Sequence, residues 1–171
     1  NFKVVKGPNL PKTNREVACY AESQDGIHWD KPKLGLFDHE GNKETNIVWR
    51  GNGCHNFSPF VDQRPNCPEN ARLKALGGLR REGGLYLFRS PDGVRWSLVR
   101  SKPVITNGYF DSQNIAFWDP TINKYRAYWR FFTAAETRAI RTAVSDDMLT
   151  WTDERDLGYV DSPEQHMYTN N

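Results

Sequence analysis

The stretch that decides the fold is SPDGVRW, from Ser90 to Trp96, because related copies of it occur three times in the chain. The first copy is SQDGIHW at residues 23–29, and the third is SDDMLTW at residues 145–151. The three tryptophans are 67 and 55 residues apart. Repeats of roughly this length are typical of arrays such as propellers, in which each repeat supplies one supersecondary unit.

Each copy has the composition of a tight turn. Asp-Gly pairs favour such turns because glycine adopts a positive φ without strain, and Ser and Asp side chains bond to turn backbone. The tryptophan is expected to pack beneath the turn. Because one active site does not need three copies, we interpret the pattern as scaffold. In the third copy Met148 stands where glycine is expected, so a different turn type is predicted there.

Alternating apolar stretches around these turns predict strands. The two later repeats carry four such stretches each, at residues 56–62, 72–76, 85–88 and 98–104, and then at 114–119, 124–129, 139–144 and 152–159. Residues 2–5 and 17–20 are further strand candidates. No stretch has a convincing helical period, and residues 133–140 are assigned to a hairpin loop and strand. Four strands per repeat is the composition of a propeller blade.

The predicted fold class is therefore all-β, a partial β-propeller of four-stranded antiparallel blades with about 2.5–3 blades. Residues 1–171 are expected to form a single partial propeller domain. It divides into the later strands of one blade at 1–50, complete blades at 51–108 and 109–160, and the first strand of a following blade at 161–171. So few blades leave sheet edges open. We therefore expect either a piece of a longer protein or a homo-oligomer that completes the ring.

The composition favours a polar β protein. The 171 residues suffice for one domain with a core, and 37% are hydrophobic and 13% aromatic, with a mean hydropathy of −0.77. The net charge of +2, from 23 basic and 21 acidic residues, gives no reason to expect nucleic acid or a membrane surface as partner. No apolar run approaches the roughly 20 residues of a membrane span. No signal-peptide pattern is found, and the cellular location is left open.

Two further features bear on structure and on metal binding. The basic residues between Arg72 and Arg81 are expected to form a solvated face. The three cysteines, Cys19, Cys54 and Cys67, include no C-x-x-C pair and are interpreted as free thiols, with a bridge between Cys54 and Cys67 as the alternative. Because the four histidines are scattered, no metal site and no cofactor are predicted.

The sequence resembles two groups of propeller enzymes. The Ser-x-Asp-Gly-x-x-Trp turn resembles the Asp-box of sialidase-type propellers, with one residue fewer between Asp and Gly. The phrases HNFSPFVDQRPNCPENARLKAL, GLYLFRSPDGVRW, YFDSQNIAFWDPTINKYRAYWRFF and EQHMYTNN resemble the five-bladed propeller glycoside hydrolases, the broad invertase-like and arabinanase-like group, through a glycosyl-hydrolase-like bacterial branch. The resemblance covers residues 17–171 and implies a five-bladed fold and hydrolysis of glycosidic bonds.

In a propeller the innermost strands line the central funnel, so function is expected where those strands begin. These positions, at residues 53–58, 109–114 and 164–170, are crowded with polar side chains that buried strands do not tolerate unpaired. Glycoside hydrolysis needs two carboxyl groups, and Asp111 and Glu164 stand at equivalent positions. The resemblance implies Glu164 as general acid, Asp111 as base or transition-state orienter, and a third carboxylate, an Asp on the first blade, that we do not find. The alternatives are a turn-capping Asp111 and an ordinary loop residue at position 164.

Polar neighbours of these carboxyls are candidates for binding sugar hydroxyl groups. The predicted substrate-binding residues are His55, Asn56, Gln113, Asn114, His166 and Tyr168. Histidines can equally be satisfied hydrogen-bonding groups, and amides can tie strand ends together. Asp62 and Asp119, at strand ends beside proline-bearing turns, are interpreted as structural.

Two functions fit this sequence. The first is a glycoside hydrolase that acts on a carbohydrate substrate without a cofactor. The alternative is a non-catalytic carbohydrate-binding or assembly module.

Overall fold

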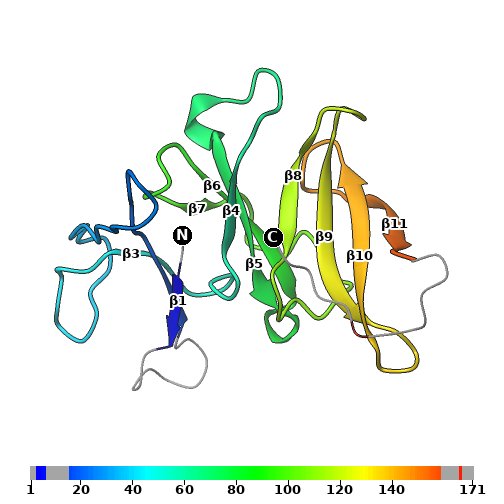
Figure 1. Ribbon diagram of the computed structural model, residues 1–171, viewed down its shortest axis with the longest axis horizontal. Coiled ribbons are helices and arrows are strands. Elements are labelled where there is room, and N and C mark those ends of the chain that lie inside the picture. The colour runs from blue at the N-terminus through cyan, green and yellow to red at the C-terminus, as the bar shows by residue number, and fades with distance from the viewer. Residues whose placement is uncertain (1–2, 7–15, 159–165, 167–171) are drawn as a thin grey trace.

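The computed structural model describes residues 3–6, 16–158 and 166 (Figure 1). Of the candidate site residues, Glu164 and Tyr168 lie outside the described residues.

Three antiparallel sheets follow one another along the chain, and in each sheet neighbours in sequence are neighbours in space (Figure 1). The first sheet contains β1 (Lys3–Lys6), β2 (Glu16–Cys19) and β3 (Ile47–Arg50). The second contains β4 (Ser58–Val61), β5 (Leu73–Leu79), β6 (Gly84–Ser90) and β7 (Ser97–Leu98). The third contains β8 (Ile115–Asp119), β9 (Lys124–Phe132), β10 (Arg138–Ser145) and β11 (Thr152–Asp156).

The predicted all-β class is confirmed. The described part of the chain contains no α-helix, and its helical turns are the short 3-10 segments η1 (Glu69–Ala71) and η2 (Arg80–Glu82). None of the three sheets closes on itself.

The alternation of side chains explains how the sheets stack. In β9, burial alternates along most of the strand, from Tyr125 through Ala127 to Trp129, as expected when one face of a strand meets a core. In β6 nearly every residue is buried, because the second sheet lies between the other two. Leu85 and Leu87 belong to a core shared with the third sheet, whereas Tyr86 and Phe88 belong to a core shared with the first.

Glycine permits a close approach inside the second sheet. A Cβ atom at Gly77 would lie 2.2 Å from the carbonyl oxygen of Gly53. The loop before β4 can therefore pack directly on β5 only because position 77 has no side chain.

The fourth strand of the second sheet is shorter than predicted. β7 covers only Ser97 and Leu98, and the chain returns to pair with β6 at Ile105, which faces Leu85. Pro103 lies in the interruption and has no backbone N–H to give to a ladder. Within this segment the Arg100 guanidinium donates to the carbonyl oxygens of Lys102 at 3.2 Å and Pro103 at 2.7 Å.

The three Ser-x-Asp-x-x-x-Trp turns have one hydrogen-bonding pattern. The backbone N–H of the fourth residue (Gly26, Gly93 or Met148) donates to the serine hydroxyl at 2.8, 2.9 and 2.8 Å. The Asp carboxylate accepts from the next two backbone N–H groups at 2.7–2.9 Å. The tryptophan Nε1 donates to the carbonyl of that fourth residue at 3.1, 2.8 and 3.2 Å. The scaffold interpretation of the repeat agrees with this geometry.

The prediction of a different turn at Met148 is wrong. Met148 has φ 64°, close to the 76° of Gly26 and the 78° of Gly93. A positive φ costs a non-glycine residue conformational energy, but the Met148 side chain is fully buried in the core between the second and third sheets. Burial of the side chain offsets the backbone cost.

The tryptophans of the turns differ in their surroundings. Trp96 is 8% exposed and packs edge-on against Phe57 at a ring centroid distance of 4.9 Å, in the core shared with the first sheet. Trp151 packs against the core shared with the second sheet. Each of these rings therefore packs toward the sheet that precedes its own. Trp29, in the first sheet's turn, is 40% exposed.

The expected solvated face between Arg72 and Arg81 is wrong at Lys74, which is 8% exposed. The Lys74 ammonium makes an ion pair with the buried Asp62 carboxylate and donates to the Ala71 carbonyl at 2.9 Å. Tyr125, from the third sheet, donates its hydroxyl to the same carboxylate at 2.7 Å. A buried charge needs such partners, so Asp62 has the structural role predicted for it.

Two smaller predictions can be compared with the structure. Asp119 is structural as predicted, since it accepts from the Thr121 backbone at 3.0 Å and from Arg126 Nε at 3.0 Å. All three cysteines are free thiols, so the alternative bridge between Cys54 and Cys67 is not formed. No helix in the described residues is long and apolar enough to cross a membrane.

Candidate carbohydrate site

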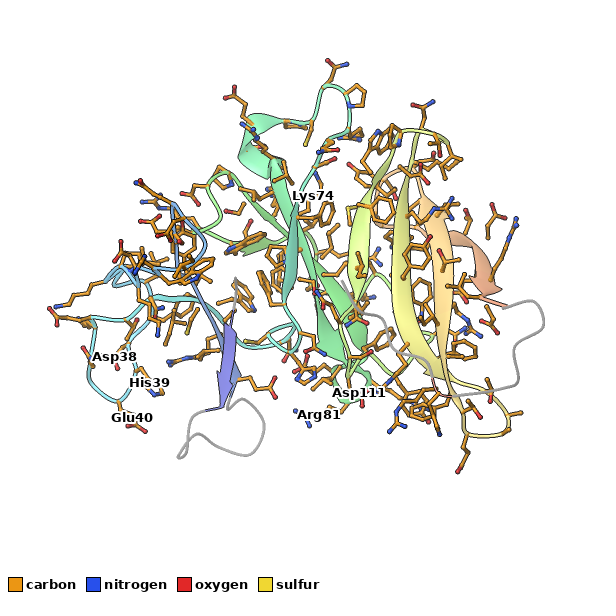
Figure 2. All side chains as sticks on the ribbon, viewed as in Figure 1. Asp38, His39, Glu40, Lys74, Arg81 and Asp111 are labelled. Atoms are coloured by element: carbon orange, nitrogen blue, oxygen red, sulfur yellow. The ribbon has the colours of Figure 1, made fainter. Side chains whose placement is uncertain are left out.

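The candidate residues gather at one end of the second and third sheets. β4 begins at Ser58, opposite Leu76, and β8 begins at Ile115, opposite Tyr128. The same end carries the β5–β6 turn and the β9–β10 hairpin, whereas the Ser-Asp-Trp turns follow the opposite ends of β6 and β10. We call it the strand-entry end, formed by residues 51–57, 80–83, 106–114 and 133–137. Figure 2 shows Arg81 and Asp111 at this end and Lys74 at the other.

Asp111 forms an ion pair with Arg130. The Asp111 side chain is 48% exposed, whereas the Arg130 side chain, on β9, is 6% exposed. A buried guanidinium therefore holds a carboxylate that solvent and ligands can reach. A neighbouring cation favours the ionised form of a carboxylate, and that is the form that a general base or nucleophile needs.

Asn56 and Asn114 position the loop that carries Asp111. Asn56 Nδ2 donates to the Ser112 carbonyl at 2.8 Å, and Asn114 Nδ2 donates to the carbonyls of Phe110 at 3.2 Å and Ser112 at 3.0 Å. Asn114 is fully buried, and Asn56 adopts φ 48°, a conformation that asparagine tolerates better than most residues. Two amides, from the loops that precede β4 and β8, thus fix residues 110–112.

His55 pairs with a carboxylate that the sequence did not reveal. Its Nδ1 lies 2.7 Å from Glu16 Oε2, and the two side chains are 20% and 14% exposed. His55 Nε2 is buried and has no hydrogen-bond partner among the described residues. Glu16 stands at the start of β2, at the end of that strand away from the Ser23–Trp29 turn. The resemblance implies a third carboxylate in the form of an aspartate on the first blade, so it does not point to a glutamate on β2.

The other predicted binding residues divide into two groups. Gln113 is exposed beside Asp111, and His166 accepts at Nδ1 from the Arg138 backbone N–H at 3.1 Å. Accepting at Nδ1 leaves the proton of a neutral His166 ring on Nε2. Tyr168, and with it the predicted general acid Glu164, lies outside the described residues.

A pocket of about 590 Å³ lies beside this loop. It is lined by rings, by arginines and by the polar groups of the 106–109 loop, including Arg80, Asn107, Tyr109, Phe131, Phe132 and Arg141. Tyr109 and Phe132 meet edge-on at a centroid distance of 4.6 Å. Tyr109 is 40% exposed, so a ring is available for stacking next to the carboxylate loop. The sequence did not predict this pocket because its walls combine strands of the third sheet with the η2 turn and with the loops at residues 106–109 and 133–134, which are far apart in the chain.

Among the described residues, no group of three or more His, Cys, Asp or Glu side chains is arranged to hold a metal ion.

Comparison with known proteins found no matching family model, no similar curated protein and no similar solved structure.

Proposed function

We propose that this chain belongs to a carbohydrate-active β-propeller and that it hydrolyses glycosidic bonds at the strand-entry end. The observation that carries the proposal is the exposed Asp111 carboxylate held by the buried Arg130 guanidinium beside an aromatic-lined pocket. Sugars present hydroxyl groups at their edges and C–H groups on their faces. A site with charged hydrogen-bonding groups next to exposed rings complements both.

The sheet arrangement supports the propeller part of the proposal. The second and third sheets are four-stranded and antiparallel, and the three sheets pack face to face in chain order, as a series of blades requires. The repeated turn then stabilises one end of each blade. The inner strands begin at the opposite end of the blades, where their first residues lie together. A ligand site at the strand-entry end follows from that geometry.

The proposed chemistry assigns one role to each carboxyl group. Glu164 gives a proton to the glycosidic oxygen as the bond from that oxygen to the anomeric carbon breaks. Asp111, ionised, takes one proton from the water whose oxygen bonds to the anomeric carbon, and the other proton of that water stays on the new hydroxyl group. Asn56 and Asn114 are positioning residues, since they hold the Asp111 loop through backbone carbonyls.

The test is sugar release from a panel of 4-nitrophenyl glycosides and from neutral and acidic oligosaccharides. Asp111→Asn and Glu164→Gln should each lower kcat by about 100-fold or more, because general acid–base groups typically contribute 10²–10⁴-fold. Asp146→Asn is the matched control, since Asp146 is an exposed carboxylate paired with Lys124 at the other end of β10. Full turnover in both site variants would overturn the assignment of Asp111 and Glu164, and no release from any substrate would contradict a hydrolase.

The second candidate is a non-catalytic carbohydrate-binding module. It is favoured by Asn56 and Asn114, whose amides are already engaged by the backbone and so hold a rigid site more than they contact substrate. In that case the chain binds an oligosaccharide without releasing sugar, and Asp111→Asn weakens binding. Glycan binding measured alongside turnover separates the two candidates.

A further inference from the structure

A connected series of rings and guanidinium groups lies in and around the pocket beside Asp111. Arg80 Cζ lies 4.5 Å from the centroid of Tyr109, and Tyr109 meets Phe132. Arg130 and Arg138 have their Cζ atoms 5.4 and 5.7 Å from the centroid of the same Phe132 ring. The rings therefore hold cations around one surface by cation–π contacts.

The carboxylates near this surface already have arginine partners. Asp111 pairs with Arg130, and Asp156 pairs with Arg141 at 2.6 Å. Glu154 accepts from Asn107 at 2.9 Å and lies 4.0 Å from Arg141. Arg141 itself stacks on Phe131, with Cζ 4.3 Å from the ring centroid. The acidic side of the pocket is thus neutralised within the chain.

Arg80 differs from these arginines. It lies in the short η2 turn, it is exposed, and it lines the pocket. Within the described residues no carboxylate lies within ion-pair distance of it. Its Tyr109 contact fixes the plane of the guanidinium without using its hydrogen-bonding edge, which can bind a planar anion through two parallel hydrogen bonds.

We propose that this pocket binds an anionic sugar, with Arg80 holding a carboxylate or sulfate group of the glycan while the sugar ring lies against Tyr109. The inference rests on the proposed carbohydrate function and names the substrate class of that site. Neutral sugars contact the rings and polar groups but leave the Arg80 guanidinium without an anionic partner. The site should therefore discriminate between acidic and neutral glycans of equal length.

Calorimetric titration of the whole chain tests the inference with three probes of equal length, namely a neutral, a uronic-acid-containing and a sulfated oligosaccharide. We expect at least one acidic probe to bind about 10- to 100-fold more tightly than the neutral one, the range typical of hydrogen bonds to charged groups. Arg80→Gln should remove that difference, so that the acidic and neutral probes bind with equal affinity. Arg80→Lys should keep only part of it, because an ammonium group lacks the planar fork.

Arg95→Gln is the matched control, since Arg95 is an exposed arginine at the opposite end of the second sheet. Circular dichroism of each variant confirms that the fold is retained. Equal affinity for acidic and neutral probes would overturn the anionic preference while leaving the proposed carbohydrate function standing. A preference that persists in Arg80→Gln would overturn the role of Arg80. No binding of any sugar would contradict the proposed function itself.

Discussion

At the scale of single residues, the Asp carboxylates of the repeated turns act as caps, because they accept hydrogen bonds from backbone N–H groups of the turn. Asp92 accepts from the N–H groups of Val94 and Arg95 at 2.9 and 2.7 Å. Burial alone would raise the pKa of Asp92, but these hydrogen bonds, together with those from the Arg95 and Ser90 side chains, lower it to about 2. The folded turn therefore stabilises the ionised carboxylate.

Replacing Asp92 should destabilise the fold in a pH-dependent way. Asp92→Ala is expected to cost about 1–2 kcal/mol at pH 7, the usual cost of losing a capping side chain. Because the folded pKa lies below the unfolded one, this contribution is present above pH ~4 and is lost as pH falls toward 2. Urea unfolding of both proteins at pH 7, 5 and 3 measures the difference.

Asp25→Ala is the matched variant for Asp92→Ala. Asp25 makes the same backbone hydrogen bonds, but Trp29 in that turn is 40% exposed whereas Trp96 is 8% exposed. The tryptophan of the first turn buries less of its surface, so Asp25→Ala should lower the free energy of unfolding by less than Asp92→Ala. An equal or larger loss at Asp25, or a difference at Asp92 that does not shrink with falling pH, would contradict this account.

At the scale of elements, the Lys74–Asp62–Tyr125 network joins β5 and the end of β4 to β9. Four groups share the Asp62 carboxylate, since the Cys67 thiol also donates to it at 3.1 Å and the Arg64 backbone N–H at 2.9 Å. Burial and the bond to Asp62 raise the pKa of Tyr125, so its hydroxyl stays a donor. These polar contacts therefore fix the position of the third sheet relative to the second inside an apolar core.

Removing the cation of this network should be costly. Lys74→Met leaves Asp62 buried without its counter-ion, and breaking a buried pair in this way typically costs about 3–5 kcal/mol. Arg72→Met, an exposed position just before β5, should change stability by less than about 0.5 kcal/mol. Chemical denaturation measures the free energy of unfolding of both variants. Similar decreases in the two would contradict a stabilising role for the Lys74–Asp62 pair.

The sequence predicted features that depend on neighbouring residues and missed contacts between residues that are far apart in the chain. The alternation of apolar residues in 124–129 and 139–144 located β9 and β10, because strand burial is a local property. Lys74 was assigned to solvent because its partners, Asp62 and Tyr125, are 12 and 51 residues away in sequence. Glu16 and His55 are likewise distant in sequence, as are the segments that line the pocket beside Asp111, so local patterns could not predict these contacts.

At the scale of the whole molecule, the sheets stack in chain order and present their strand entries at a common end. Trp96 and Trp151 each pack toward the preceding sheet, while Trp29 and Ile27 are 40% and 77% exposed. We therefore expect a further sheet to cover that face in the assembled protein, from additional blades or from a second copy of the chain. Sedimentation distinguishes these sources, since a species of 19.8 kDa alone would exclude the second copy.

The central claim is that a glycan binds at the strand-entry end and not at the repeated turns. Hydrogen–deuterium exchange, with and without the oligosaccharide that a glycan array selects, tests it most directly. The account predicts added protection in residues 51–57, 80–83, 106–114 and 133–137, and unchanged exchange in residues 23–29, 90–96 and 145–151. Protection confined to the three turns, or an array without any bound glycan, would contradict it.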